Sequence, residues 1–204
     1  MIVIGLCGSS GSGKGYVCKK LKELYLIEHI DTDKVYRDIV RGDSPCLREL
    51  CEYFGNEILS EDGSLDRRVL SAKVFEGTDS DKRLKRLNEI THKYIKVETE
   101  RILEESKSAG VWAIMIDAPV LFESGFDKLC DCTVCVTAPR ELKLKRITKR
   151  DGISLEKAEA RLRSQMTDEE LRGLCGFEIV NNDSGDLEIR MEAFFNELKN
   201  KFEI

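Results

Sequence analysis

Long hydrophobic runs are missing from this sequence of 204 residues. No apolar stretch approaches the roughly 20 residues that a membrane-spanning helix needs, so we expect no membrane partner. The first residues, Met1-Ile2-Val3-Ile4, lead directly into a glycine-rich turn. This start lacks the basic segment and the cleavage site of a signal peptide, which predicts a cytoplasmic protein.

A surplus of positive charge is also missing, because the formal net charge is −5. Proteins that bind phosphate backbones usually carry a basic surplus, so nucleic acid is not expected as a partner. A small anionic substrate stays open, since a local basic cluster can bind it whatever the total charge. The length fits one domain with an insertion, expected as a monomer or a small homo-oligomer.

Histidine is scarce, with only His29 and His92, whereas the chain has eight cysteines. Cys132 and Cys135 form a CxxC pair, but no second pair with ligand spacing accompanies them. Both histidines are also distant in sequence, which argues against zinc at this pair. The pair lies in a Val- and Cys-rich run typical of a strand, where cysteine behaves as a small apolar residue. A structural role with reduced thiols is therefore predicted.

Short apolar runs alternate with helical patterns along the chain, which indicates an α/β fold with a parallel sheet covered on both faces. Strands are predicted at 2–7, 26–30, 111–116, 131–137 and 177–180, and helices at 140–150, 154–165 and 186–202. Residues 34–110 look largely helical, and this interval is too long for a simple crossover between strands. The predicted organisation is a nucleotide-binding core at 1–33, 110–150 and 175–204, a helical acceptor-binding insertion at 34–109 and a helical lid at 151–174.

The segment from Gly8 to Lys14 matches the G-x-x-x-x-G-K core of the Walker A loop and lies between a predicted strand and a predicted helix. Its glycines let successive N–H groups turn toward phosphates, and the following helix presents its positive N-terminus. Lys14 adds a charge at the β and γ oxygens. The predicted ATP-binding residues are Gly8, Gly11, Ser12, Gly13, Lys14, Gly15 and Tyr16.

The loop departs from the motif after Lys14, where Gly15 and Tyr16 stand in place of the hydroxyl residue that binds Mg²⁺. Glycine offers no ligand atom, so no side chain is assigned as a direct metal ligand. Mg²⁺ tolerates this, because it keeps several waters and binds phosphate oxygens. Asp31 and Asp117 are the candidates for holding metal-bound water.

Phosphoryl transfer also needs a group that accepts the proton of the attacking hydroxyl. Asp33 is the candidate general base, because we expect it at the end of the second strand, on the sheet edge that carries the loop. The alternative for an aspartate after a strand is helix N-capping. That alternative stays open for Asp31.

Further motifs resemble those of the dephospho-coenzyme A kinases over nearly the whole chain. The matching segments are Ile4-Gly5-Leu6, Asp31-Thr32-Asp33 with Arg37, Phe54-Gly55, Asp62 to Arg67, Asn88 to His92, Asp117 to Glu123, Arg146 with Arg150, Gln165, and Val180-Asn181. The resemblance implies a three-layer P-loop kinase fold that uses ATP and Mg²⁺. It also implies phosphorylation of the ribose 3′-hydroxyl of dephospho-coenzyme A, the last step of coenzyme A synthesis.

The resemblance assigns roles to individual residues. It makes Asp33 the general base, Lys14 a phosphate ligand and Arg146 the lid arginine that stabilises the transferring charge, with Arg150 also at the nucleotide. The acceptor-binding residues that it implies are Asp33, Arg37, Arg67, His92, Leu121 and Glu123. Taken alone, the basic stretch 140–150 also fits a solvated helix face, His92 a buried core histidine, and Arg67 a partner of Asp66.

Two other functions stay open. A nucleoside monophosphate kinase or another small-molecule kinase is suggested by Gly13-Lys14-Gly15, but the segments 62–67 and 117–123 count against it. A nucleotide-binding protein without catalysis is suggested by the missing hydroxyl at Gly15. The retained Asp33 counts against that, because a binding relic has no need of a base.

Overall fold

The computed structural model describes residues 1–203, which form two compact units. The first unit contains Met1–His29 and the chain from Gly110 onward, and the second contains Ile30–Ala109. The second unit begins four residues before the insertion predicted at 34–109 and ends at the same residue. The predicted core segment 175–204 ends at Ile204, which lies outside the described residues.

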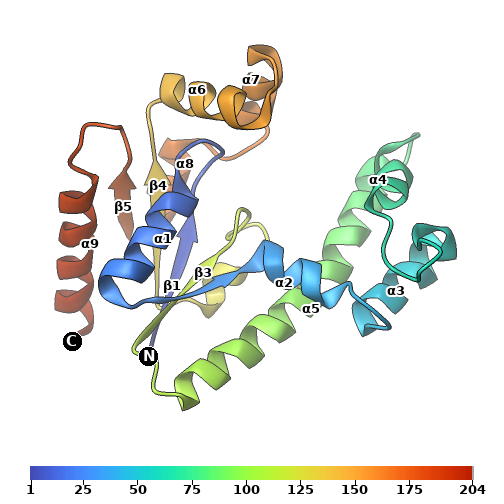
Figure 1. The fold of residues 1–204 in the computed structure, drawn as a ribbon, viewed down its shortest axis with the longest axis horizontal. Helices are drawn as coiled ribbons and strands as arrows, with labels where there is room; N and C mark the ends of the chain where they lie inside the picture. Colours follow the sequence, from blue (N-terminus) through green and yellow to red (C-terminus); the bar gives the residue numbers. More distant parts are fainter. Residues whose placement is uncertain (204) are drawn as a thin grey trace. The chain divides into compact units, whose positions relative to one another are not determined.

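Helices and strands alternate in the first unit, whereas the second is helical (Figure 1). In chain order the elements are β1 (Ile2–Cys7), α1 (Lys14–Tyr25), β2 (Glu28–Asp31), α2 (Thr32–Ile39), α3 (Pro45–Phe54), the 3₁₀ helix η1 (Asn56–Ile58), α4 (Arg67–Phe75), α5 (Ser80–Ser108), β3 (Ala113–Asp117), the 3₁₀ helix η2 (Phe126–Leu129), β4 (Cys132–Thr137), α6 (Arg140–Asp151), α7 (Leu155–Arg163), α8 (Asp168–Leu174), β5 (Phe177–Val180) and α9 (Leu187–Phe202).

The strands form one sheet in the order β2-β3-β1-β4-β5. The pairs β3–β1, β1–β4 and β4–β5 are parallel, and Ile4 of β1 lies opposite Met115 and Cys132. Every residue of β1 is buried, as expected for a strand covered on both faces. The predicted α/β class with a parallel sheet is confirmed. The predicted strands 2–7 and 177–180 match β1 and β5 residue for residue, and the others agree within two residues.

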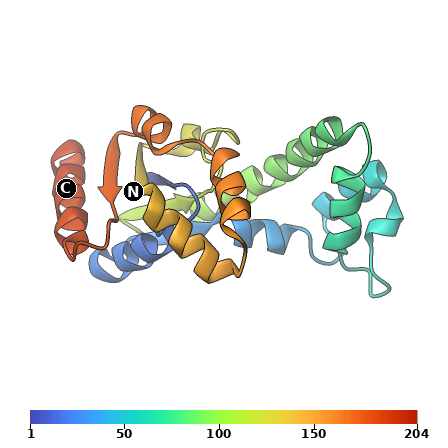
Figure 2. The same ribbon diagram turned by 90° about the horizontal axis from the view of Figure 1, so that it is seen from above.

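Helices cover both faces of this sheet (Figure 2). On one face, Leu21 of α1 and Phe194 of α9 join Ile4 in a single apolar cluster. Neighbouring residues of a strand point to opposite faces, so Gly5 faces the other way. A Cβ at Gly5 would lie 2.9 Å from Leu121 Cδ2, so the chain after β3 packs closely on that second face.

The second unit is built around α5, which α2, α3 and α4 contact. Its apolar core includes Leu50, Phe54, Ile58 and Ile90. The helices of this unit are interrupted at 40–44, 59–66 and 76–79. The predicted helical character of this interval is confirmed. Within residues 1–203, no helix combines the length and the apolar character that a membrane crossing requires.

Helix α8 is a short element that the sequence analysis did not predict. It begins with a capping box, in which Thr167 Oγ1 accepts from the Glu170 amide at 3.2 Å. In return, Glu170 Oε2 accepts from the Thr167 amide at 2.7 Å. This reciprocal pair provides acceptors for two of the backbone N–H groups that have no partner within the first turn of a helix. It explains how so short a helix begins within the predicted lid.

Candidate active site

The phosphate loop connects β1 to α1 and follows the predicted strand–loop–helix pattern. Gly11 and Gly13 have φ of +78° and +86°, a region that favours glycine. Gly13 is the N-cap of α1, and no side chain caps this helix. The N–H groups of the first turn are therefore directed toward the loop, where the helix favours an anion.

Gly11 lies where the loop passes very close to helix α6. A Cβ at this position would lie 2.6 Å from the carbonyl oxygen of Lys143 and 2.9 Å from its Cα. Both are backbone atoms, which cannot rotate away as a side chain can. Glycine at position 11 is thus required by its conformation and also by its surroundings.

Several polar side chains from distant parts of the chain hold the loop in place. The Ser10 amide donates to Gln165 Oε1 at 2.9 Å. Lys143 Nζ donates to Ser9 Oγ at 3.1 Å and to Asp168 Oδ1 at 2.8 Å. Only 9% of the Lys143 side chain is exposed, so its charge is compensated by this aspartate. These contacts link the loop to α6 and to the start of α8.

Arg146 supports the same loop from α6. Its Nη1 donates to the carbonyl oxygens of Gly11 and Ser12 at 3.0 and 3.1 Å. Its Nη2 reaches Asn181 Oδ1 at 3.3 Å and Asp183 Oδ1 at 2.5 Å, and Asn181 Nδ2 in turn donates to Ser12 O at 2.8 Å. In this arrangement the guanidinium group of Arg146 binds loop carbonyls.

Two pockets adjoin the loop within the first unit. One has a volume of about 600 Å³. Its lining residues are Gly13, Tyr16, Arg146, Asn181, Asp183, Gly185, Leu187 and Glu188. The other, of about 80 Å³, is lined by Gly8, Ser9 and Gln165 together with Leu121 and Glu123. Leu121 is buried and Glu123 is exposed, so this pocket has an apolar wall and an acidic rim.

Asp117, the last residue of β3, lies beside the loop lysine. Lys14 Nζ contacts its Oδ1, and His29 Nε2 lies 3.5 Å from its Oδ2. Only 12% of the Asp117 side chain is exposed, so the carboxylate is held between two basic groups. The role predicted for Asp117, which is to hold metal-bound water, stays a prediction.

In the second unit, Asp31 caps helix α2. Its Oδ1 accepts from the amides of Asp33 and Lys34 at 2.9 and 3.1 Å, and Arg37 Nη2 lies 3.6 Å from its Oδ2. The alternative of N-capping is therefore confirmed for Asp31. Asp33 was expected at the end of the strand, but it lies in the first turn of α2 and is exposed. The expected placement is wrong because Asp31 ends the strand and starts the helix.

Arg67 and His92 also lie in the second unit. The Arg67 guanidinium stands over the ring of Tyr36, 5.8 Å from its centre, whereas the neighbouring Asp66 accepts from the Arg68 and Val69 amides as the N-cap of α4. His92 is half-buried in α5. Arg67 thus contacts Tyr36, and Asp66 caps the helix instead of pairing with Arg67 as the alternative reading of the sequence had it.

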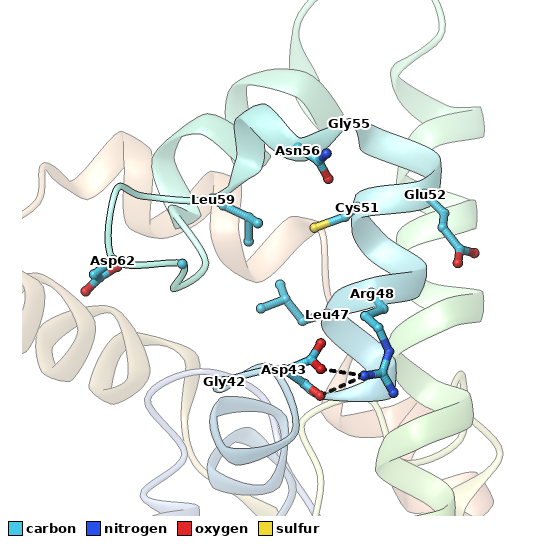
Figure 3. Close-up of a pocket in the computed structure, with 11 residues that line it drawn as sticks. Gly42, Asp43, Leu47, Arg48, Cys51, Glu52, Gly55, Asn56, Leu59 and Asp62 are labelled. Atoms are coloured by element: carbon cyan, nitrogen blue, oxygen red, sulfur yellow. Dashed lines mark hydrogen bonds and ion pairs between the residues drawn. The ribbon is translucent and has the colours of Figure 1, made fainter.

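A third pocket, of about 730 Å³, lies within the second unit (Figure 3). It is lined by Leu47, Cys51, Leu59 and Asp62 among others. Arg48 Nη1 pairs with Asp43 Oδ2 at 2.9 Å at its rim. None of the predicted acceptor-binding residues lines it.

Comparison with known proteins gives the family. The family model for dephospho-CoA kinase matches residues 2–187. The dephospho-CoA kinase of Dehalococcoides mccartyi is 38% identical over 182 residues, which are 89% of each chain, and that of Moorella thermoacetica is 43% identical over 166 residues, 81% of this chain and 76% of the relative. A solved dephospho-CoA kinase from Campylobacter jejuni has a TM-score of 0.71 at 27% identity, with 98% of each chain covered.

This chain belongs to the dephospho-CoA kinase family. The predicted resemblance and the P-loop kinase fold are confirmed. In this family member, the two pockets beside the phosphate loop are lined by loop residues together with Arg146, Leu121 and Glu123. Arg150, by contrast, donates through Nε to Asp151 at 2.7 Å, and the role predicted for it at the nucleotide stays a prediction.

Four loop supports of this kinase had no role in the sequence analysis: Lys143, Gln165, Asp168 and Asn181. Gln165 and Asn181 appeared in the family motifs but were assigned no contact. A signal for Lys143 existed, because it shares one helical face with Arg146 and the buried Ile147. The contacts that Gln165, Asn181 and Asp168 make with the loop itself join residues more than 150 positions apart in the chain, which no local pattern predicts.

The CxxC run of the kinase lies in β4, as predicted, and Cys132 and Cys135 are buried. Burial raises the pKa of Cys132 to about 11 and that of the nearby Cys130 to about 12. Thiols with such pKa values stay protonated at neutral pH, and the thiolate is the form that binds metals. These properties fit the structural role predicted for the run.

The burial of His92 makes the free energy of unfolding of the kinase depend on pH. Burial lowers the pKa of His92 below the usual 6.5, so the unfolded chain binds a proton that the folded chain resists. Stability is therefore lost as the pH falls below about 6.5. We expect an NMR titration of His92 in a His29→Gln background, where it is the sole histidine, to give a midpoint below 6.5. A midpoint at or above 6.5 would contradict this reasoning.

Proposed function

We propose that this chain transfers the γ-phosphoryl group of ATP to the ribose 3′-hydroxyl of dephospho-coenzyme A, which gives ADP and coenzyme A. The observation that carries the proposal is a Walker A loop that keeps the motif from Gly8 to Lys14, in a chain whose family relatives are dephospho-CoA kinases. The cysteines of the described residues are thiols and not disulfides, which supports a reducing, cytoplasmic location.

The loop fits the phosphates of ATP. Helix α1 has no side-chain cap, so its first-turn N–H groups can bind phosphate oxygens. Ser12 Oγ is buried and makes no hydrogen bond within residues 1–203. Lys14 would neutralise the β- and γ-phosphates, and the pocket beside Tyr16 would hold the nucleoside.

Mg²⁺ fits this site through its carboxylates and through the nucleotide, since Gly15 offers no hydroxyl. Asp117 beside Lys14, and Asp31 at the start of α2, would hold metal-bound water. The bound metal would neutralise charge that develops on the phosphate oxygens.

The acceptor side is proposed to depend on Asp33. Its carboxylate would take the proton of the 3′-hydroxyl as that oxygen bonds to the γ-phosphorus, and the bond from the γ-phosphorus to the bridging oxygen of ADP breaks. Arg146 would stabilise the transferring charge, and Arg150 would bind the nucleotide. The residues proposed to bind the acceptor are Arg37, Arg67, His92, Leu121 and Glu123.

The test is ADP release from Mg-ATP with dephospho-coenzyme A, AMP, CMP or shikimate as acceptor. We expect turnover with dephospho-coenzyme A and little with the others. Turnover of AMP or CMP without dephospho-coenzyme A would favour another small-molecule kinase. Tight ATP binding with no turnover of any acceptor would favour a nucleotide-binding protein without catalysis.

Replacing Gly15 tests whether the missing hydroxyl limits metal use. A Cβ at Gly15 has nothing within 4 Å, so Gly15→Ser adds the hydroxyl without a collision. We expect this variant to reach half-maximal turnover at a lower Mg²⁺ concentration. Gly173→Ser is the matched control, because Gly173 is also helical and has open space around its Cβ. Unchanged Mg²⁺ dependence in Gly15→Ser would show that the hydroxyl is not limiting.

A further inference from the structure

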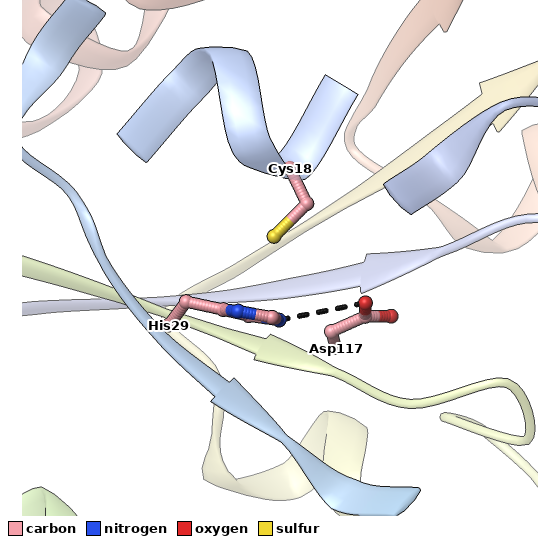
Figure 4. A group of neighbouring side chains, drawn as sticks. All are labelled: Cys18, His29 and Asp117. Carbon is pink, nitrogen blue, oxygen red and sulfur yellow. Dashed lines mark ion pairs between the residues drawn. The ribbon is translucent and has the colours of Figure 1, made fainter. Parts of the chain in front are cut away.

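Three side chains with different metal-ligating atoms converge beside the sheet (Figure 4). Cys18 comes from α1, His29 from β2 and Asp117 from the end of β3. One ligand atom of each lies within 4.8 Å of the others. No other group of three His, Cys, Asp or Glu residues comes this close in the part of the chain that the structure describes.

We propose that Cys18, His29 and Asp117 form a binding site for a zinc-class divalent cation, a different ion from the Mg²⁺ that accompanies ATP, whose bound water Asp117 is also proposed to hold. A thiolate and an imidazole prefer Zn²⁺ or Co²⁺, whereas Mg²⁺ prefers oxygen ligands. Three protein ligands with one position left for water is a common zinc arrangement. Binding displaces the proton of the Cys18 thiol to solvent, and the thiolate and the carboxylate together balance the charge of the cation.

The distances are close to those that a tetrahedral site needs. Zinc bond lengths place neighbouring N, O and S ligands about 3.4–3.6 Å apart. His29 Nε2 and Asp117 Oδ2 already lie 3.5 Å apart. Since one ligand atom of each residue lies within 4.8 Å of the others, the largest separation among these atoms exceeds the required spacing by at most roughly 1.3 Å.

The cluster lies close to the surface. Part of the His29 side chain (26%) and of the Asp117 side chain (12%) is exposed, whereas Cys18 and the His29 Nε2 atom are buried, so the His29 ring has to turn for a cation to enter. Lys14 contacts Oδ1 of Asp117, whereas His29 faces Oδ2. A cation on Oδ2 can therefore bind while Lys14 holds the other oxygen, as outer groups commonly do for ligating carboxylates.

The test is a Co²⁺ titration of the whole chain without nucleotide or Mg²⁺, so that its outcome does not depend on kinase activity. We expect one equivalent to produce a near-ultraviolet thiolate-to-cobalt band and tetrahedral visible bands. Cys18→Ala should lose the thiolate band, and His29→Gln should weaken binding by at least about tenfold. Cys132→Ala is the matched control, because Cys132 is buried in the same apolar cluster as Cys18, and it should keep the band.

Thermal unfolding provides a second measurement that also checks folding. Zn²⁺ should raise the melting temperature of the wild type and of Cys132→Ala, because a ligand that binds the folded state stabilises it. It should have little effect on His29→Gln, whose ring is partly exposed and whose replacement should leave the fold intact. Absence of the thiolate band in the wild type, or its persistence in Cys18→Ala, overturns the proposal. An equal Zn²⁺ shift in His29→Gln also overturns it.

Discussion

Asp33→Asn is expected to lower turnover by about 10²–10⁴-fold, the usual contribution of a general base, while the affinity for ATP stays nearly intact. The amide keeps the shape of the carboxylate but cannot accept the proton of the acceptor hydroxyl. The backbone should not change, because Asp31, not Asp33, caps the helix through its contacts to the Asp33 and Lys34 amides. Steady-state kinetics and direct ATP binding measure the two quantities separately.

Asp38→Asn is the matched control for this prediction. Asp38 is an exposed aspartate on the same helix, and it pairs with Arg41 at 3.1 Å. Its replacement changes the charge of α2 by the same amount and should leave turnover close to that of the wild type. An Asp33→Asn enzyme as active as Asp38→Asn would remove the assignment of Asp33 as the base.

Gly11→Ala is expected to weaken ATP binding by more than about tenfold, which corresponds to about 1.4 kcal/mol. The added Cβ would lie 2.6 Å from Lys143 O, so either the loop or helix α6 has to shift. A shift of the loop moves the N–H groups that bind phosphate. The variant should also unfold at a lower temperature, since φ of +78° costs about 1–2 kcal/mol for a residue with a side chain.

Gly152→Ala separates the strain of the backbone from the collision. Gly152 ends α6 with φ of +63°, and nothing lies within 4 Å of its added Cβ. This variant should therefore lose stability through strain alone and keep its affinity for ATP. If Gly11→Ala also kept wild-type affinity and lost no more stability than Gly152→Ala, the close approach to α6 would have no role in binding.

Most of the fold of the first unit could be predicted because its strands are short apolar runs that end at turn or acidic residues. β1 stops where the glycines of the loop begin, and β3 stops at Asp117. The junction after β2 was harder. Two aspartates, Asp31 and Asp33, stand two positions apart, and only the hydrogen bonds show which one caps the helix.

The phosphate loop could be predicted from its motif, but the side chains that support it could not. The family resemblance assigns Arg146 to the transferring charge, and the sequence did not predict that its guanidinium group binds the loop carbonyls. The basic stretch 140–150 looks uniformly solvated in sequence, yet Lys143 is buried. Burial of a lysine depends on a partner from elsewhere, here Asp168, and such a partner leaves no mark on the local pattern.

Cysteine shows the same limit of local patterns. The conspicuous CxxC pair, Cys132 and Cys135, lies in a strand of the core. Cys18, which approaches His29 and Asp117, is a single cysteine on an amphipathic helix and has no spacing signal. Its neighbours His29 and Asp117 come from strands β2 and β3, so that only the folded chain shows the cluster.

The contacts that support the phosphate loop order its backbone during folding, before a nucleotide binds. Gln165 holds the Ser10 amide, and Arg146 and Asn181 hold the Ser12 carbonyl. Fixing the backbone of a flexible residue costs roughly 1–2 kcal/mol in entropy, and these contacts place that cost on folding instead of on nucleotide binding. The loop amides should therefore exchange slowly with deuterated solvent in the nucleotide-free protein, and calorimetry should find only a small conformational entropy loss when ATP binds.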